Sequence, residues 1–370
     1  MAAGPWRWCL LAGLLAAGCG SGGAGSPGTG GSGSSGSGGA TGSGGVTGSG
    51  GATGAGSGLF TAAEPWTKDV SGLTKDGSSD AIIAALDDAG GWGGGRLQID
   101  FSIPLFFADA STPLRTISGP APGGYSYCYG GPDCDPVPFQ MPIPANGNAE
   151  GSTSYTCDTS YQTDGQGDCH ILVAEPGQQK LYELYNATAA GGGIDALVAI
   201  IWDLTKAYPD NERGDQCTSA DAAGFPIAGL LPTADDVAAG AVDHALRFIL
   251  PNGSMRNKAY VHPASHAGTP SSPDPNAPPY GVRFRLKAGF DDSAYDAGEK
   301  VIIAAMKKYG MLLSDGGTIA LTFADDRTTT AKWADLGVTA LSFSAITPDD
   351  FEVVDFGAPI AQTNDCVRDP

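Results

Sequence analysis

Carboxylates placed among aromatic side chains are the first candidates for chemistry in this sequence. Glu183 in Leu-Tyr-Glu-Leu-Tyr and Asp203 in Trp-Asp-Leu both lie in strand-like, aromatic-rich segments. Glycoside hydrolysis requires one carboxylic acid and a second carboxylate as base or nucleophile, and a sugar can stack on an aromatic ring such as that of Trp202. Asp221 and Asp315 lie in turn-like contexts, where catalytic groups are commonly exposed. A cap or turn role is the alternative for each carboxylate.

The histidines are the second set of candidates. His262 and His266 have i, i+4 spacing, which on a helix would direct both imidazoles toward one metal ion. The residues before His262 are typical of a strand, however, and the glutamate of the zinc-protease motif is absent. We therefore predict no metal and no cofactor. In an elimination reaction, His244 or His266 would instead serve as the base.

Cations are concentrated in the strand-like segment 282–287. Strand alternation places its apolar side chains on one face and Arg283, Arg285 and Lys287 on the other. This cationic face either pairs with surface acids or forms a floor that receives the carboxylates of a substrate or of catalytic acids. Arg247 is a further candidate for substrate binding. It points away from His244 if both lie on one strand.

The N-terminal segment has the features of an export signal. Arg7 precedes a short apolar run, and Leu-Ala-Ala-Gly-Cys at residues 15–19 resembles a bacterial lipobox, in which cleavage leaves Cys19 as the lipidated N-terminus. Ordinary secretory cleavage with an incidental Cys19 is the alternative. We expect a signal at 1–19, a disordered Gly/Ser/Thr tether at 20–58 and one globular domain at 59–370. The protein would then lie on the outer membrane, at the cell surface or in the periplasm.

The net charge limits the kinds of binding partner that we expect, and the number of cysteines indicates the compartment in which the protein folds. The formal net charge of −20 argues against nucleic acid and anionic membranes as partners, so membrane contact would come only through the lipid anchor. The even number of cysteines after residue 19 predicts three disulfides in an exported chain. Short loops favour Cys128–Cys134 and Cys157–Cys169, which leaves Cys217–Cys366. A zinc site is the competing interpretation, but no C-x2-C pair is present.

Hydrophobic periodicity predicts a mainly β fold. Helices are expected at 79–89, 233–242, 296–309 and 331–336. Strands are expected at 96–107, 170–174, 180–185, 197–204, 244–250, 282–288, 318–323 and 351–354. Residues 123–168 are expected to form long loops held by disulfides. We predict a β-sandwich or jelly-roll core with a few packing helices, and α+β as the second choice.

Several longer motifs resemble those of a family of secreted bacterial proteins of unknown function. They include Ser-Ala-Asp-Ala-Ala-Gly at 219–224, His-Ala-Leu-Arg-Phe at 244–248 and Gly-Val-Arg-Phe-Arg-Leu-Lys at 281–287, within a similarity over about 130–355. The family has an aromatic residue at the position of His262 and an arginine at that of Ser265, which favours His266 over a two-histidine metal site. The resemblance implies a common site built from Asp221, His244, Arg247, His266, Arg283 and Arg285. It implies no particular reaction.

These observations leave three functional hypotheses. The first, which we favour, is an enzyme that acts on polysaccharide, either a glycoside hydrolase or a lyase acting on an acidic glycan. The second is a non-catalytic polysaccharide-binding or adhesion lipoprotein, and the third a structural component of the cell envelope. An enzyme requires two acids, or an acid and a base, facing one cleft at about 5–10 Å. A binding protein requires only an aromatic platform without perturbed carboxylates.

Overall fold

The computed structural model describes residues 58–119, 128, 132–157 and 167–368. The predicted signal at 1–19, including Cys19, and positions 20–57 of the predicted tether lie outside the described residues. The folded part belongs to one compact unit, Gly51–Pro370. In the described part of the chain, no helix is long and apolar enough to span a membrane.

A mixed six-stranded sheet carries much of the C-terminal half of the chain. Its strands in spatial order are β1 (Ile99–Ile103), β12 (Leu321–Ala324), β8 (Leu246–Leu250), β11 (Met311–Gly316), β10 (Arg283–Leu286) and β13 (Phe351–Val353). Strand β8 pairs in parallel with β11 and antiparallel with β12. Every residue of β10 and β12 is buried, as expected for strands covered on both faces.

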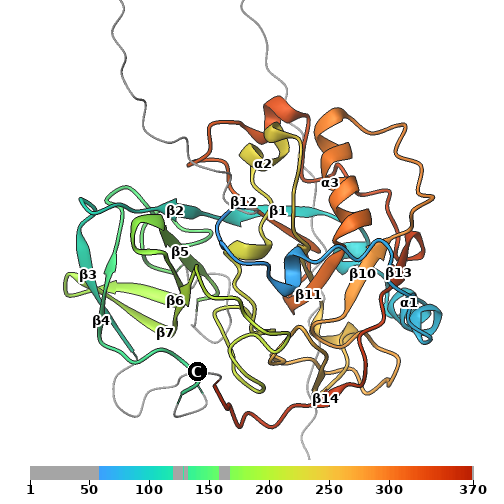
Figure 1. Cartoon of the computed structure of the whole chain (residues 1–370), viewed down its shortest axis with the longest axis horizontal. Helices are drawn as coiled ribbons and strands as arrows, with labels where there is room; N and C mark the ends of the chain where they lie inside the picture. Colours follow the sequence, from blue (N-terminus) through green and yellow to red (C-terminus); the bar gives the residue numbers. More distant parts are fainter. Residues whose placement is uncertain (1–57, 120–127, 129–131, 158–166, 369–370) are drawn as a thin grey trace, which may run out of the picture. The chain divides into compact units, whose positions relative to one another are not determined.

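A second six-stranded sheet lies on the left in Figure 1. Its strands in order are β2 (Leu105–Phe107), β5 (His170–Glu175), β6 (Lys180–Ala190), β7 (Gly193–Asp203), β3 (Leu114–Ser118) and β4 (Phe139–Pro142). β6 and β7 form a long hairpin whose two turn residues, Gly191 and Gly192, both have positive φ. A tight hairpin turn of this kind favours glycine at both positions. A third, two-stranded sheet pairs β9 (Ala259–Tyr260) with β14 (Ile360–Ala361).

One extended segment joins the two large sheets. β1 lies at the edge of the first sheet and β2 at the edge of the second, and only Pro104 separates them (Figure 1). The larger hydrophobic core contains side chains from both sheets, among them Leu181 and Trp202 from the second and Phe248 from the first. A smaller core covers the opposite face of the second sheet. Both faces of the hairpin are therefore buried in the part of β6 from Leu181 to Leu184 and in the part of β7 that pairs with it.

Three α-helices pack around the first sheet: α1 (Ser79–Asp88) against β13, α3 (Ala297–Lys308) against β10, and α2 (Ala234–Ala239) against α3. Helix α3 begins with a capping box of Asp296 and Glu299, and it buries Ile302 and Met306. The apolar spacing is one of the signals that predict a helix at 296–309, together with Lys307, Lys308 and Gly310 at its C-terminal end; the capping box was not part of that prediction.

The predicted fold class is confirmed: the described chain is mainly β, with three helices packed on the outside. The predicted strand at 244–250 begins only at Leu246, so His244 precedes it. The expected turn at Ser314 and Asp315 is wrong, because both residues belong to β11. Strands β3 and β4 were not predicted, and β4 lies in the stretch 123–168 that was expected to form only loops.

The predicted disulfide pairing is confirmed for all six cysteines after residue 19. Cys128 is bonded to Cys134, Cys157 to Cys169, and Cys217 to Cys366. The first two close loops of 6 and 12 residues, whereas the third joins positions 149 residues apart.

Candidate functional site

A pocket of about 200 Å³ lies where the two large sheets and several loops meet. The second sheet contributes Tyr185 and Val198, and Asp168 lies just before β5. The first sheet contributes Asp315 and Gly316 at the end of β11. The remaining lining residues are in loops: Thr218, Ser219, Ala220, Ala222, Asn252, His266, Gly268, Thr269 and Tyr280.

A buried arginine links two acids beside this pocket. Arg247 on β8 is 3% exposed, and its Nε lies 2.8 Å from Asp221 Oδ1. Its Nη2 lies 2.8 Å from the same oxygen and 2.9 Å from Asp315 Oδ2, while Nη1 donates to Thr322 Oγ1 at 2.9 Å. Two acceptors of one nitrogen cannot be more than about 6 Å apart. Arg247 therefore holds the two carboxyl groups close together, with all three guanidinium nitrogens engaged.

A β-bulge positions Asp315. Along β11, Leu313 pairs with Phe248 and Asp315 pairs with the next residue of β8, so Ser314 is the extra residue. Bulges of this kind redirect side chains near functional sites. Burial raises the pKa of Asp315, and the charge of Asp168 adds to this effect, while Arg247 opposes it. A quarter of the Asp315 side chain, 25%, remains exposed. A carboxyl group of raised pKa that faces a pocket can act as a general acid.

Asp221 lies behind the pocket wall and is completely buried. Its backbone N–H donates to Ser219 Oγ at 2.9 Å, which fixes the turn that carries it. Its Oδ2 has no hydrogen-bond partner in the described part of the chain. Burial raises the pKa of Asp221 to about 7, although Arg247 lowers it. Asp221 thus changes its charge near neutral pH next to Asp315.

His170 at the start of β5 forms a buried ion pair below the pocket. Its Nδ1 lies 2.6 Å from Glu150 Oε2, and its Nε2 lies 3.1 Å from the carbonyl oxygen of Ala220, which lines the pocket. Burial lowers the pKa of His170, but the Glu150 carboxylate outweighs burial and holds that pKa at about 9. The protonated ring donates both N–H groups, so it fixes the turn that carries Asp221.

Two tyrosines form aromatic parts of the pocket wall. Tyr185 packs against the His170 ring, with centroids 5.3 Å apart. Tyr280 is 1% exposed, and its hydroxyl has no hydrogen-bond partner among the residues that the structure describes. A Cβ atom added at Gly268 would lie 3.2 Å from this hydroxyl, so the hydroxyl lies next to another lining residue of the pocket.

Glu183 and Trp202, predicted to act on a sugar, lie in the larger core instead. Both are 0% exposed. The Trp202 indole N–H donates to Glu183 Oε2 at 3.0 Å, and the Ala228 N–H donates to Glu183 Oε1 at 2.9 Å. Neither side chain lines the pocket. The structure therefore offers no open face of Trp202 on which a sugar could stack.

The burial of Glu183 predicts a pH-dependent stability. Burial raises the pKa of Glu183 to about 7 in the folded protein, from an ordinary value of 4.5. The folded state therefore holds this proton more tightly, which contributes about 3 kcal/mol that is complete below pH 4.5 and is lost as the pH rises through about 7. We expect Glu183→Gln to flatten the decline in urea-unfolding free energy over this range, and the exposed Asp335→Asn to leave it unchanged. An unaltered slope in Glu183→Gln would contradict this assignment.

The structure places two other candidates away from the pocket. The Asp203 side chain accepts hydrogen bonds from the backbone N–H and the hydroxyl of Thr205, at 2.8 and 2.7 Å, and so stabilises an exposed turn. His244 is completely buried, and its Nδ1 lies 2.8 Å from the carbonyl oxygen of Ala245. Of the five predicted catalytic residues, only His266 lines the pocket, and Asp221 lies directly behind its wall.

Arg283 and Arg285 hold the N-terminal part of the fold rather than the pocket. Arg283 donates to the carbonyl oxygen of Pro65 at 2.8 Å. Arg285 donates to the carbonyl oxygens of Val70 and Leu73 and is paired with Glu352. Both side chains are 7% exposed. Arg283 lines a second cavity of about 270 Å³, but Arg285 does not.

The two closely spaced histidines do not share a site. No helix forms between them; His262 Nε2 lies 2.9 Å from Asp215 Oδ1 and lines the second cavity, whereas His266 lines the first. Among the described residues, the one group with metal-ligand spacing is Asp133, Cys217 and Cys366. The two sulfur atoms of that group are joined in a disulfide, so they offer no thiolate to a metal.

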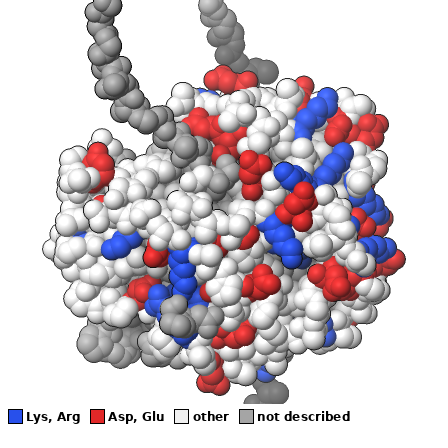
Figure 2. Space-filling model, viewed as in Figure 1, with Lys and Arg blue, Asp and Glu red and all other residues white. Residues whose placement is uncertain are grey.

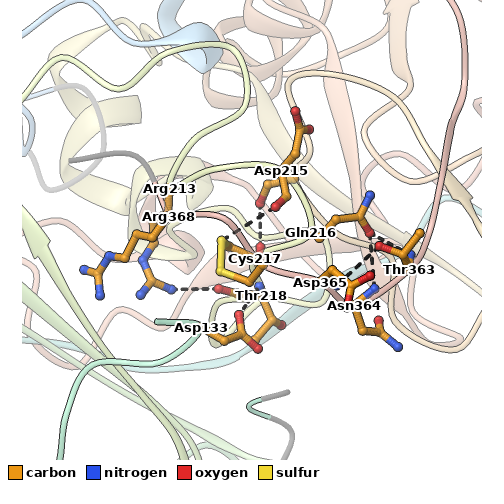
Figure 3. The surroundings of a disulfide bond; sticks show 12 residues. Asp133, Arg213, Asp215, Gln216, Cys217, Thr218, Thr363, Asn364, Asp365 and Arg368 are labelled. Carbon is orange, nitrogen blue, oxygen red and sulfur yellow. Dashed lines mark hydrogen bonds between the residues drawn. A yellow bond between two sulfur atoms is a disulfide. The ribbon is translucent and has the colours of Figure 1, made fainter. Parts of the chain in front are cut away.

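Figure 3 shows how the Cys217–Cys366 disulfide fastens the C-terminal segment beside the pocket loops. The Gln216 side chain accepts a hydrogen bond from the backbone N–H of Thr363 at 2.8 Å and donates one to the carbonyl oxygen of Ala361 at 3.0 Å. The next residue after Cys217, Thr218, lines the pocket and donates its N–H to Asp133 at 2.7 Å. The disulfide therefore fixes a segment that leads directly into the pocket wall.

Removal of this disulfide is expected to destabilise the fold. Replacing both cysteines by serine should lower the free energy of unfolding by about 2–4 kcal/mol, because the bond closes a loop of 149 residues and restricts the unfolded chain. Urea denaturation would measure the loss. The matched variant Cys128→Ser/Cys134→Ser opens a loop of only 6 residues and should lose less. Equal losses for the two variants would contradict the loop-length explanation.

Sequence reasoning did not select several residues that the structure brings to this site: Asp168, His170, Tyr185 and Tyr280. Asp315 was noted, but as part of a turn. Asp168 precedes a disulfide cysteine and His170 within a motif of the family resemblance, and this motif was the available signal. The sequence around the two tyrosines contains no such signal, because an aromatic residue on a strand is usually part of the core.

Comparison with known proteins finds no relative of this chain. No protein-family model matches this chain, and neither a curated protein nor a solved structure is significantly similar to it. The resemblance to secreted bacterial proteins stays a prediction, and function has to be argued from the site itself.

Proposed function

We propose that the protein is a glycoside hydrolase that acts on a polysaccharide. The observation that carries this proposal is that Asp315, with its raised pKa, and Asp168 line one pocket together with Tyr185 and Tyr280. A pair of carboxyl groups with different environments is what hydrolysis of a glycosidic bond requires.

In this mechanism Asp315 is the general acid. Its proton passes to the glycosidic oxygen as the bond from that oxygen to the anomeric carbon breaks, and Arg247 stabilises the resulting Asp315 carboxylate. Asp168 acts as the second carboxylate in one of two ways. It takes a proton from the water that attacks the anomeric carbon, or it attacks that carbon itself to form a glycosyl ester, which water deprotonated by Asp315 then hydrolyses, releasing the Asp168 carboxylate. His170 and Asp221 position the turn and the arginine behind these groups.

The alternatives receive less support from this geometry. A non-catalytic binding protein would need an aromatic platform without perturbed carboxyl groups. Trp202 is enclosed in the core, and the tyrosines of the pocket wall stand beside Asp315, whose pKa is raised. A lyase would need an arginine free to neutralise a uronate. Arg247, Arg283 and Arg285 are all engaged by carboxylates or backbone carbonyls.

Incubation of the purified protein with a panel of neutral, amino and acidic polysaccharides tests the proposal. New reducing ends are expected. Absorbance from an unsaturated uronate would indicate elimination instead. Retention on a polysaccharide without either signal would identify a binding protein and overturn the hydrolase proposal.

We also propose export and lipid anchoring through Cys19. Three disulfides support an oxidising compartment. In the producing bacterium, Cys19→Ser should move the protein from the membrane fraction to the soluble fraction, because acyl chains supply the membrane affinity. Unchanged membrane association would argue against the lipid anchor.

A further inference from the structure

The charge of the pocket limits the kinds of sugar that it can hold. Asp168, which is exposed, and Asp315 both line it, and among the described lining residues there is no lysine or arginine. Arg247 touches Asp315 but has its nitrogens engaged by Asp221, Thr322 and Asp315. Burial lowers the pKa of His266, so this ring is neutral near pH 7. A ligand in the pocket therefore meets the negative charge of Asp168, with no lysine or arginine among the described lining residues to offset it.

Two further features of the wall suit a cationic ligand. The Tyr280 hydroxyl, on a residue that is 1% exposed, has no hydrogen-bond partner among the described residues and lies next to Gly268 in the pocket wall. Its oxygen can accept a hydrogen bond from an ammonium group. The aromatic face of Tyr185 attracts cations electrostatically.

The size of the pocket limits the ligand to a small group. Its volume of about 200 Å³ is below the range of roughly 300–1,000 Å³ that holds drug-sized molecules. One unit of a longer chain is the ligand that matches both this size and the proposed reaction.

We propose that the pocket selects a sugar unit that carries a free, protonated amino group, so that the substrate is a glycan of de-acetylated amino sugars. This inference rests on the proposed hydrolase function and narrows its substrate class. The ammonium group pairs with the Asp168 carboxylate and donates a hydrogen bond to the Tyr280 hydroxyl oxygen. A uronate in the same place would be repelled by the Asp168 carboxylate, and an N-acetyl group would bring no positive charge to pair with it.

The test uses the full chain and compares sugars that differ at one group. NMR titration measures the affinity for glucosamine and galactosamine, for their N-acetyl forms, for glucose and galactose, and for the two uronic acids. The titration is done at about pH 7, where most of the amine is protonated. Methylamine controls for charge alone. We expect the amino sugars to bind at least about tenfold more tightly than every other compound in the series.

Two matched variants separate the pocket from the general charge of the protein. Asp168→Asn should abolish the preference for amino sugars. Asp335→Asn removes the same charge from an exposed site and should keep that preference. This control matters because acidic side chains are spread over the face of the molecule seen in Figure 2.

Each outcome bears on one of the two proposals. Equal affinity for N-acetyl, neutral and amino sugars, or for methylamine and glucosamine, would overturn the inference, and so would the absence of binding by any sugar. Cleavage of a neutral or N-acetylated glycan would then leave the hydrolase proposal intact. Selective binding of amino sugars without cleavage of any amino-sugar polymer would support the inference and overturn the hydrolase proposal.

Discussion

Replacing Arg247 by methionine is expected to destabilise the folded protein by about 3–5 kcal/mol. The guanidinium group is 3% exposed, and it is the charge partner of Asp221, which is completely buried, and of Asp315. Without it, the Asp221 carboxylate has no compensating charge in a site that water does not reach. Urea denaturation at neutral pH, compared with the unmodified protein, measures the loss.

Two comparisons make this prediction specific. The pKa of Asp221 is about 7 even beside Arg247, so the loss should be smaller under acidic conditions, where the carboxyl group becomes neutral. Adding Asp221→Asn to Arg247→Met should recover part of the stability for the same reason. The exposed Arg96→Met should change the unfolding free energy by less than about 0.5 kcal/mol. A loss in Arg247→Met as small as that in Arg96→Met would show that the ion pairs are not what stabilises this region.

Replacing Asp315 by asparagine is expected to lower kcat/KM on the best polysaccharide by about 100-fold or more. Asparagine has nearly the same shape and still accepts the Gly316 N–H, which lies 2.7 Å from Asp315 Oδ1, but it has no proton to give to the leaving oxygen. Burial raises the pKa of Asp315, and only the protonated group can donate, so wild-type activity should fall as the pH rises through that pKa. The variant should lack this decline.

Substrates with different leaving groups distinguish loss of the acid from loss of structure. An aryl glycoside that releases a stable phenolate needs little help from an acid, so Asp315→Asn should retain much more of its activity on this substrate than on the polysaccharide. Asp335→Asn, which changes an exposed carboxylate elsewhere, should retain full activity on both. An equal loss of activity on the two substrates would exclude Asp315 as the proton donor.

Local sequence patterns correctly predicted those parts of the structure that depend on residues close together in the chain. The helix at 296–309 follows from its capping residues and apolar spacing, and the structure places α3 at Ala297–Lys308. The three disulfides follow from an even number of cysteines and short spacings. Asp221, Arg247 and His266 were also selected from sequence, and the structure brings all three to one region.

Sequence could not show which strand faces are covered. Trp202 and Glu183 have the pattern of an aromatic and an acid on an open sheet, but hydrophobic cores cover both faces of β6 and β7. Arg283 and Arg285 lie on the side of β10 opposite to the apolar side chains, as alternation predicts. That side is covered by residues more than 200 positions earlier in the chain, so its cations bind backbone carbonyls there.

The position of Asp315 depends on a single extra residue in a strand. Ser-Asp-Gly-Gly at 314–317 is typical of a turn, and no local signal distinguishes that turn from a bulged strand end. The bulge becomes evident only when β11 is aligned with its neighbour β8. Contacts of this type, between segments about 65 residues apart, determine the pocket, and they are the part of the fold that local patterns do not encode.

The Cys217–Cys366 bond also has a consequence for biosynthesis. A nascent chain leaves the ribosome N-terminus first, so Cys217 emerges 149 residues before its partner Cys366. Cys128 and Cys157 emerge only 6 and 12 residues before their partners. During that interval the Cys217 thiol is open to exchange with the earlier pairs. Formation of the Cys217–Cys366 disulfide, in which an external disulfide oxidant takes up the two electrons of the thiols, therefore comes last. A chain that stops before Cys366 keeps an unpaired Cys217 thiol next to the pocket wall.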